Sequence, residues 1–361
     1  MDIKYSPKDL EASIYKKWTD NDCFSAKDLK SNYSIVLPPP NVTGTLHMGH
    51  AFQHTIIDIL IRYNRMLGKS VLWQPGTDHA GIATQLVVEN NLAREGKTRH
   101  DIGRKALVDE IWKWKEKSGN TIISQTKRIG SSADWNRNRF TMDDGLSDAV
   151  KKVFITLYDE GLIYRGNRLV NWDIKLQTAI SDLEVTNVEK IGHLYHIKYE
   201  IEDSEETLTV ATTRPETLFG DTAICVNPND ERYKGLIDKK AKLPLTNRLI
   251  KIISDDSIDM DFGTGCVKIT PAHDFNDYKL GKKHKLEFIN ILNKDGTFNG
   301  NVGNKFKGMG IHESRKLILA ELKNIGLLGE IEDYKTTVPM GERSGEIIEP
   351  LLTDQWFMKM E

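Results

Sequence analysis

Cysteine is scarce in this sequence, and its scarcity excludes two kinds of stabilisation. The 361 residues contain three cysteines, Cys23, Cys225 and Cys266. They are odd in number and far apart, so they provide neither a disulfide framework nor a Cys-x-x-Cys metal pair. We therefore expect no structural zinc and no metal site in this segment. Cys266 is expected to be a small buried hydrophobe rather than a nucleophile.

Long apolar runs are also missing. No run approaches the ~18 residues of a membrane-spanning helix. Met1 leads into the polar stretch MDIKYSPKD, which lacks the apolar core of a signal peptide. These observations predict a cytoplasmic protein.

Neither sign of charge dominates the chain. The 50 Lys and Arg against 52 Asp and Glu leave a formal charge of −2, so no global basic field indicates a nucleic-acid partner. A local excess occurs in residues 94–139, with 12 basic against 6 acidic residues. This stretch either faces a polyanion or forms a solvated helical face.

What remains is the composition of an ordinary globular protein. Hydrophobic residues make up 39% and charged residues 28% of the sequence, which excludes disordered and collagen-like classes. At roughly 150 residues per domain, the length predicts about two domains. No internal repeat or low-complexity tract is present.

The first part of the chain alternates helices and strands. Residues 6–18 predict an opening helix, and 33–37, YSIVL, predict a buried strand that ends at three prolines. Apolar residues at helical spacing predict a long amphipathic helix over 50–67, and 70–73 predict a second strand. A strand–helix–strand unit of this kind is normally parallel and right-handed.

The pattern of apolar residues and turns changes further along the chain. Helices are expected over 99–130 and 143–161, and a strand over 162–172. After residue 190, short strands such as 193–201 and 207–212 alternate with glycine turns. The pattern predicts an α/β fold with a parallel sheet, interrupted by an inserted β-rich domain that ends near residue 340.

A first group of candidate site residues lies between the strand at 33–37 and the helix that follows. The segment PPPNVTGTLHMGH places His47 and His50 at the beginning of that helix. Helix N-termini bind phosphate groups, and ligands of parallel sheets lie beyond the carboxyl ends of strands. Two imidazole donors there would stabilise charge that develops on an α-phosphate, and Gly49 would let a nucleotide approach the backbone. The alternative is that His47 only caps the helix and His50 only packs.

These residues and several other segments resemble one enzyme family. The resemblance is carried by PPPNVTGTLHMGHA, RMLGK at 65–69, GTDHAGIATQ at 76–85, NWD at 171–173, TAISD at 178–182 and DQWF at 354–357. Together they resemble the valyl-tRNA synthetases of class I. The synthetases for leucine and isoleucine share the His-x-Gly-His pattern and remain an alternative.

The resemblance implies a fold, substrates and site residues. It implies the first half of a Rossmann-like catalytic domain over 1–187, an inserted domain called connective peptide 1 over 188–340, and a return segment over 341–361. His47 and His50 would be catalytic. The residues that would bind ATP are Thr45, His47, Gly49 and His50.

Three further residues would bind the amino acid. Pro40 and Asn41 would line the aliphatic pocket, and Asp78 would pair with the valine ammonium. A carboxylate suits this role because a charge-assisted hydrogen bond is stronger than a neutral one. The structural alternative for Asp78 is that it caps the next helix.

The β-rich region contains two polar clusters that resemble an editing domain. The first is TTRPET at 212–217 with GDTA at 220–223, and the second is GTGCVKITPAHDFND at 263–277. A pocket shaped for valine cannot strongly reject threonine, which differs by a hydroxyl in place of a methyl group; the valine enzyme is itself the usual example of this limit. A polar second site that hydrolyses the wrong ester solves the problem, because valine would leave its buried polar groups unpaired.

The resemblance also assigns roles inside this second site. Asp277 would hold the ammonium of the mischarged amino acid, and polar neighbours would complete the pocket or position the ester and the terminal adenosine. The full set is Thr212, Thr213, Arg214, Thr217, Lys268, Thr270, Asp274 and Asp277. We expect a positioned water rather than a covalent intermediate, since no Ser-His-Asp arrangement is recognisable.

Simpler structural roles for these clusters stay open. The first cluster would be a strand ending in a turn, and the second a helix cap. Phe219 stands where we expect a smaller or more flexible apolar residue in the valine enzymes, and Leu218-Phe219-Gly220 is similar to the leucine enzymes, so the shape of the pocket around Phe219 stays open.

The expected activity is that of a valine–tRNA ligase with editing. Its substrates would be ATP with Mg²⁺, L-valine and tRNA(Val), and we expect a monomer. A lysine-rich KMSKS-like loop, which the family needs, is not found before Glu361, so we expect the chain to be truncated. The alternatives are a stand-alone deacylase that edits mischarged tRNA, and a non-catalytic module that binds tRNA or a nucleotide.

Overall fold

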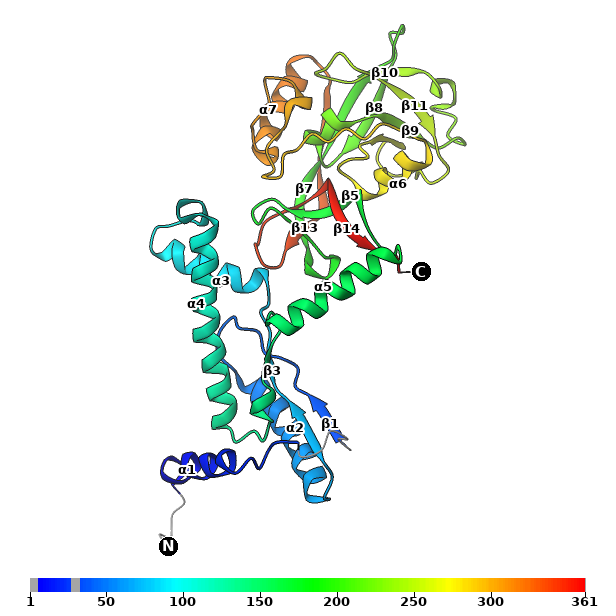
Figure 1. The fold of residues 1–361 in the computed structure, drawn as a ribbon. Helices are drawn as coiled ribbons and strands as arrows, with labels where there is room; N and C mark the ends of the chain where they lie inside the picture. Colours follow the sequence, from blue (N-terminus) through cyan, green and yellow to red (C-terminus); the bar gives the residue numbers. More distant parts are fainter. Residues whose placement is uncertain (1–5, 27–32, 361) are drawn as a thin grey trace. The chain divides into compact units, whose positions relative to one another are not determined.

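A computed structural model describes residues 6–26 and 33–360 of the chain. The chain divides into two compact units, Met1–Gly161 and Leu162–Glu361; each is shown in Figure 1. Within the described residues, no helix combines the length and the apolar character needed to cross a bilayer. The fold confirms the α/β class with an inserted β-rich region, whereas the functional domain limits at 187/188 and 340/341 stay predictions.

The first unit contains the expected strand–helix–strand motif. Strand β1 (Tyr33–Val36) runs parallel to β2 (Val71–Gln74), and α2 (Met48–Met66) connects them. The small core of this motif consists of Leu37, Ile57, Ile61, Val71, Trp73 and Ala133. Since both strands point the same way, the loops that follow them lie at the same edge of the sheet.

The remaining elements of the first unit are mostly helical. The helices are α1 (Pro7–Asp20), α3 (Ile82–Arg94), α4 (Arg99–Arg128) and α5 (Asp144–Asp159), and β3 (Gly76–Thr77) pairs with β4 (Arg139–Phe140) in parallel. The helices expected over 99–130 and 143–161 are confirmed. From the sequence, helix α3 was considered only as the helix that Asp78 would cap.

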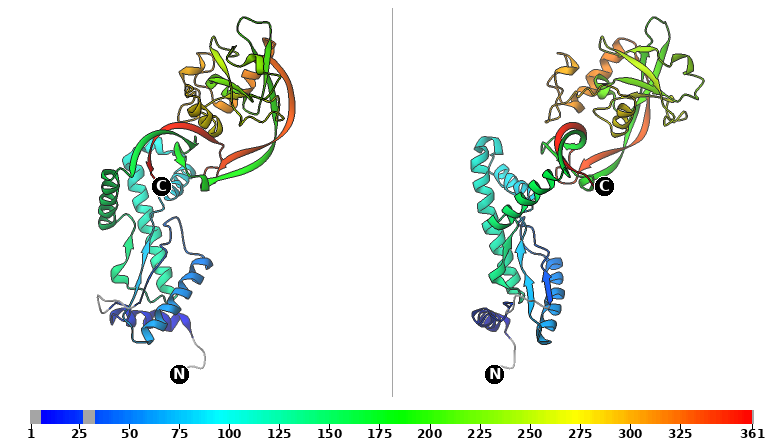
Figure 2. Two further views of the ribbon diagram at one scale, coloured as in Figure 1. Left: turned by 90° about the vertical axis from the view of Figure 1, so that its right-hand side faces the viewer. Right: turned by 45° about the vertical axis from the view of Figure 1, so that its right-hand side comes forward.

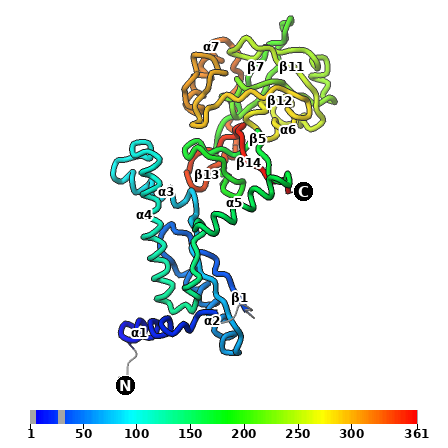
Figure 3. Tube along the Cα trace, viewed as in Figure 1, coloured from blue at the N-terminus to red at the C-terminus, as the bar shows by residue number. Residues whose placement is uncertain are grey.

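The second unit begins and ends on paired strands. Strand β5 (Ile163–Asp173) pairs antiparallel with β14 (Ile348–Met358) along its whole length, and β6 (Thr178–Ile180) extends β5 on its other side. Figure 3 shows β14, in red, beside β5. This pairing places the strands before and after the insert in one compact unit.

Two further sheets form the body of the insert. In one, β7 (Val185–Glu200) lies between β13 (Leu328–Gly341) and β8 (Thr207–Thr212), and Figure 2 shows β7 and β13 side by side in both views. The other has the order β10 (Lys240–Lys242), β11 (Leu249–Ser254), β9 (Ala223–Val226) and β12 (Cys266–Ile269). Helices α6 (Phe275–Lys283) and α7 (Ile311–Asn324) accompany these sheets.

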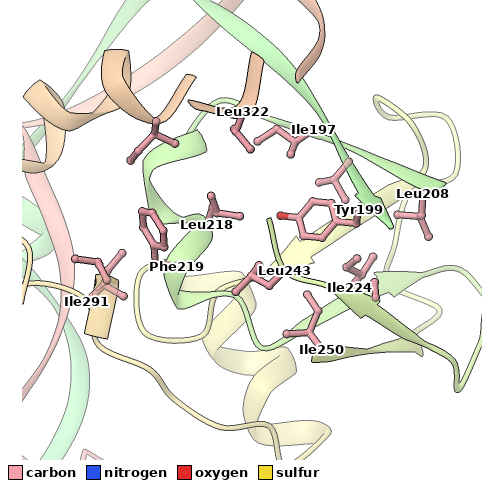
Figure 4. Packing of buried hydrophobic residues seen from close by; sticks show 14 of the residues in the cluster. Ile197, Tyr199, Leu208, Leu218, Phe219, Ile224, Leu243, Ile250, Ile291 and Leu322 are labelled. Atoms are coloured by element: carbon pink, nitrogen blue, oxygen red, sulfur yellow. The ribbon is translucent and has the colours of Figure 1, made fainter. Parts of the chain in front are cut away.

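A large apolar core joins the sheets and α7. The short helical turn Pro215–Gly220 directs Leu218 and Phe219 into this core, where Leu322 of α7 also lies (Figure 4). Phe219 is 1% exposed, and its ring centroid lies 5.0 Å from that of Phe306. The side chain of Phe219 therefore belongs to the core.

Candidate functional site

His47 and His50 stand at the N-terminus of α2, as the sequence predicts. His47 is the N-cap residue, and its Nδ1 accepts a hydrogen bond from the backbone N–H of Gly49 at 3.1 Å. In return, Nδ1 of His50 accepts from the backbone N–H of His47 at 3.3 Å. Because both Nδ1 atoms are acceptors, the proton of each neutral ring is on Nε2. Both imidazoles therefore have an N–H donor left for a ligand.

Packing at the helix start keeps this pair of rings together. The two ring centroids are 4.0 Å apart, and a Cβ atom on Gly49 would lie 2.9 Å from Cε1 of His47. Burial and the neighbouring His47 lower the pKa of His50, which keeps that ring neutral. His47 does cap the helix, as the structural alternative states, and this cap also sets the tautomer needed for donation.

The three residues expected to bind the amino acid lie together. Asn41 forms a parallel bridge with Asp78. The backbone N–H of Asp78 donates to the carbonyl oxygen of Pro40 at 2.8 Å, and the N–H of Val42 donates to that of Asp78 at 2.9 Å. The loops after β1 and β2 thus meet at one edge of the sheet.

The carboxylate of Asp78 has a role other than helix capping. Its Oδ1 accepts hydrogen bonds from Thr141 Oγ1 at 3.0 Å and from the N–H of Ala80 at 3.1 Å. The next helix, α3, begins at Ile82 with Gly81 as its N-cap. The capping alternative for Asp78 is therefore wrong, and the carboxylate is held at the strand edge from two directions.

Helix α4 fixes the loop that contains the first motif. Trp114 Nε1 donates to the carbonyl oxygen of Val42 at 2.8 Å, and Ser118 Oγ donates to that of Gly44 at 2.7 Å. Gln125 Oε1 accepts from the N–H of Leu46 at 2.8 Å. These supporting residues could not be identified from the sequence alone. Their spacing places them on one face of α4, but it does not show that the loop packs against that face.

In the second unit, all eight residues expected in the editing site line one cavity of about 820 Å³. They are Thr212, Thr213, Arg214, Thr217, Lys268, Thr270, Asp274 and Asp277. The structural alternatives also describe the local geometry, because β8 ends at Thr212 and Asp274 caps α6. The turn and the cap thus direct the two clusters toward the cavity.

Lys268 organises the floor of this cavity. Its ammonium donates to Thr217 Oγ1 at 2.8 Å, to Thr270 Oγ1 at 2.6 Å and to Asp221 Oδ1 at 2.8 Å. A lysine has three N–H donors, so all of them are in use. Asp221 is fully buried and also accepts from the hydroxyl of Tyr199 at 2.8 Å. Asp221 was quoted in the first cluster but not assigned to the site, although it follows the cluster directly.

The two aspartates of α6 differ in their surroundings. Oδ1 of Asp274 accepts from the N–H groups of Asn276 and Asp277 at 2.8 and 3.0 Å. Oδ2 of Asp277 accepts from the N–H of Thr270 at 2.8 Å. Burial, followed by the charge of Asp274, raises the pKa of Asp277 to about 7. Asp277 is therefore a carboxyl group that gains stabilisation when a cation binds next to it.

His273 lines the same cavity but does not act as a base. Its Nε2 accepts from the N–H of Ile291 at 3.0 Å, so its Nδ1 carries the proton and faces the carbonyl oxygen of Pro350 at 3.2 Å. Burial and the charge of Arg214 lower its pKa to about 3. Both ring nitrogens are in use, which leaves the cavity without a histidine base.

The cysteines of the insert are also unsuited to nucleophilic attack. Cys225 and Cys266 are buried, and burial raises the pKa of the Cys225 thiol to about 12 and that of Cys266 well above its usual value. A thiolate is the nucleophilic form of cysteine. The expectation that Cys266 is a buried hydrophobe is confirmed. Within residues 6–26 and 33–360, no three His, Cys, Asp or Glu side chains gather as metal ligands would.

Comparisons with known proteins agree on one family. A family model described as tRNA synthetases class I (I, L, M and V) matches residues 13–361. The Valine--tRNA ligases of Francisella tularensis subsp. tularensis (strain SCHU S4 / Schu 4) and Legionella pneumophila (strain Paris) are each 58% identical over 359 residues. Each alignment covers 99% of this chain, and the chain spans 39% of the length of these relatives.

Among solved structures, one similar chain is the LeuRS of Agrobacterium radiobacter K84 in a ternary complex with tRNA and LeuAMS. The TM-score is 0.45 at 18% sequence identity. The superposition covers 92% of this chain and 48% of that chain.

Proposed function

We propose that this chain, which belongs to the class I tRNA synthetases (I, L, M and V), provides two sites of a valine–tRNA ligase. The first site activates L-valine with ATP for transfer to tRNA(Val). The second hydrolyses threonine from mischarged tRNA(Val). The 58% identity to valine ligases supports valine over leucine and isoleucine as the substrate.

The activation step is supported by what lies at the edge of the β1–β2 sheet. The Nε2–H donors of His47 and His50 stand at a helix N-terminus, where an anion is favoured. A valine carboxylate oxygen attacks the α-phosphorus of ATP, the bond to the bridging oxygen breaks, and pyrophosphate leaves. The two donors stabilise the charge that develops on the phosphate oxygens. Mg²⁺ is assigned to the substrate, because it offsets the phosphate charge of ATP.

Asp78 supports the orientation of the amino acid. Its Oδ1 is held by Thr141 and Ala80, so the carboxylate has a defined direction toward the ammonium of valine. Pro40 and Asn41 lie beside it through the backbone pairing of the two loops. Orienting the carboxylate nucleophile in this way lowers the entropic part of the barrier.

The editing step is supported by the cavity of the second unit. Water attacks the ester carbonyl of threonyl-tRNA, the bond between the carbonyl carbon and the ribose oxygen breaks, and the proton passes to that oxygen. Asp277 binds the threonine ammonium, while Thr217 and Thr270, both held by Lys268, present hydroxyl groups. A threonine hydroxyl can donate a further hydrogen bond to these oxygens, which already donate to Arg214 and Asp221, whereas a valine methyl group cannot.

One observation carries the proposal. All eight predicted editing residues line one cavity, although they come from segments about fifty residues apart. The test is ATP–pyrophosphate exchange with valine in a protein that carries this sequence at the length of the relatives. We expect exchange to depend on valine rather than on leucine. Exchange that depends equally on leucine and valine would contradict the assignment.

A stand-alone deacylase is a second candidate function. It is favoured by the fact that every residue lining the cavity comes from the second unit. Deacylation of threonyl-tRNA(Val) without valine-dependent exchange would support it over the ligase. We also propose a monomer in the cytoplasm, which sedimentation and cell fractionation test.

A further inference from the structure

Arg214 is tied into the protein by its whole guanidinium group. Its Nη1 donates to the carbonyl oxygen of His273 at 3.1 Å, its Nε lies 3.4 Å from Oε1 of Glu216, and its Nη2 donates to Oε2 of Glu349. Glu216 belongs to the first polar cluster and His273 to the second. Glu349 belongs to neither, since it lies on β14, 135 residues further along the chain. One side chain thus joins both clusters to a distant strand.

Of the two carboxylates around Arg214, Glu349 is the stronger partner. Glu216 already receives two hydrogen bonds from Arg315 of α7, at 2.8 Å each, in a bidentate arrangement. Arg214 is left with only a long contact to Glu216. Glu349 is 2% exposed, and its other oxygen lies 3.3 Å from Nε2 of His312. Removing the Glu349 charge would leave Arg214 without its main counter-ion.

The next residue on β14 holds the second cluster. The carbonyl oxygen of Pro350 faces Nδ1 of His273 at 3.2 Å. His273 directly precedes Asp274, the N-cap of α6, and α6 carries Asp277. Two adjacent positions of β14 therefore contact the two halves of the cavity, one through Arg214 and one through His273.

We propose that Glu349 is a positioning residue of the editing cavity, which holds the Arg214 guanidinium between the two polar clusters. This proposal rests on the proposed editing function for its kinetic readout. Glu349 does not line the cavity, so it acts through Arg214 rather than on the substrate. A buried carboxylate suits this role because a buried ion pair fixes one geometry when its remaining hydrogen bonds are satisfied.

The kinetic test uses the whole chain and follows deacylation of threonyl-tRNA(Val). We expect Glu349→Gln to lower kcat at least tenfold, because the neutral amide no longer restrains Arg214. In an Arg214→Ala background, the same change should alter kcat less than twofold. Glu346→Gln is the matched control, since Glu346 lies just before β14 in an exposed pair with Lys175 and should leave kcat within twofold.

Two outcomes would overturn the proposal. One is wild-type kcat in Glu349→Gln, and the other is that the effects of Arg214→Ala and Glu349→Gln multiply as independent changes do. If Glu349→Gln does not fold, Glu349→Asp is the variant to test, because it keeps the charge but shortens the side chain. We expect Glu349→Asp to lower kcat about threefold. This loss should disappear in the Arg214→Ala background. An undiminished kcat in Glu349→Asp would then contradict the proposal.

A second readout separates this inference from the editing function. The Nη2–H signals of Arg214, which donates to Glu349 through Nη2, should be protected from exchange with water in ¹⁵N–¹H spectra of the wild type and of Glu346→Gln, and should lose that protection in Glu349→Gln. Equal protection in all three proteins would overturn the positioning role. If the wild type fails to deacylate threonyl-tRNA(Val), the proposed function fails, and the Arg214 signal still decides the role of Glu349.

Discussion

The two candidate sites are held in place in different ways. In the first unit, His47 and His50 are fixed by backbone groups within three residues of each other. In the second unit, the partners that hold Lys268 and Arg214 include side chains 47 to 135 residues away. The histidine pair of the first site is a local structure that presents free donors, on a loop that α4 holds, whereas the second site is a buried network in which most polar atoms already have partners. We therefore expect the histidine pair to tolerate distant substitutions better than the network does.

Breaking the network at Lys268 should give the largest effect. Lys268→Met leaves the buried Asp221 without its cation, so we expect the free energy of unfolding to fall by about 3–5 kcal/mol and deacylation of threonyl-tRNA(Val) to become undetectable. Chemical denaturation and the deacylation assay measure the two effects.

A matched control for Lys268 exists on the surface of the same sheet. Lys251 is exposed on β11, and Lys251→Met should change stability by less than about 0.5 kcal/mol. If Lys268→Met lowered the free energy of unfolding as little as Lys251→Met does, the residues around Lys268 would not form an interdependent network.

The local site should lose function without losing stability. Asparagine is a good N-cap residue, so His47→Asn keeps the cap on α2 but removes the Nε2–H donor. We expect ATP–pyrophosphate exchange, measured at the length of the relatives, to fall about 10²- to 10³-fold. The midpoint of thermal unfolding should stay near the wild-type value. A large fall in that midpoint would show that His47 is a structural residue only.

The pH dependence of editing distinguishes the two sites further. Burial and Asp274 raise the pKa of Asp277 to about 7, so its carboxyl group is neutral below that pH and charged above it. Only the charged form binds an ammonium, and kcat/KM for deacylation should fall about tenfold per pH unit below about 7.

Asp277→Asn is the control for this profile. It removes the titrating group, so the remaining rate should follow the uncatalysed hydrolysis of the ester. If the fall in kcat/KM near pH 7 persists in Asp277→Asn, the titration belongs to another group.

A steric change at the helix start should have the smallest effect. Gly49→Ala places a Cβ atom 2.9 Å from His47 Cε1, which displaces the ring and should lower exchange about tenfold. Gly44→Ala is the matched control in the same loop, because no atom lies within 4 Å of its added Cβ. Equal rates in the two variants would show that the orientation of His47 is unimportant.

The place of the histidine pair was predictable because near neighbours determine its geometry, whereas the α4 residues that hold the preceding loop were not. The motif that follows the strand was sufficient to place His47 and His50 at the start of α2. The order of parallel strands is sufficient to bring Pro40 next to Asp78. The capping role considered for Asp78 failed, because the N-cap residue of α3 is Gly81, three residues later.

The network was only partly predictable. Both polar clusters were identified by resemblance, but their connection through Arg214 and Glu349 depends on the pairing of β14 with β5, which no local pattern shows. A single glutamate in the apolar run IIEPLL was a usable signal, since a charge inside a buried strand needs a partner. The place of Phe219 in the core was not predictable, because a short stretch of sequence does not reveal which side chains face the core.

The most direct test of the account compares deacylation of threonyl-tRNA(Val) and valyl-tRNA(Val) by this chain, with Asp277→Ala measured alongside. We expect the threonyl ester to be hydrolysed at least about tenfold faster than the valyl ester, and Asp277→Ala to remove this difference. Equal hydrolysis of both esters, or a preference that survives in Asp277→Ala, would contradict the proposed editing function.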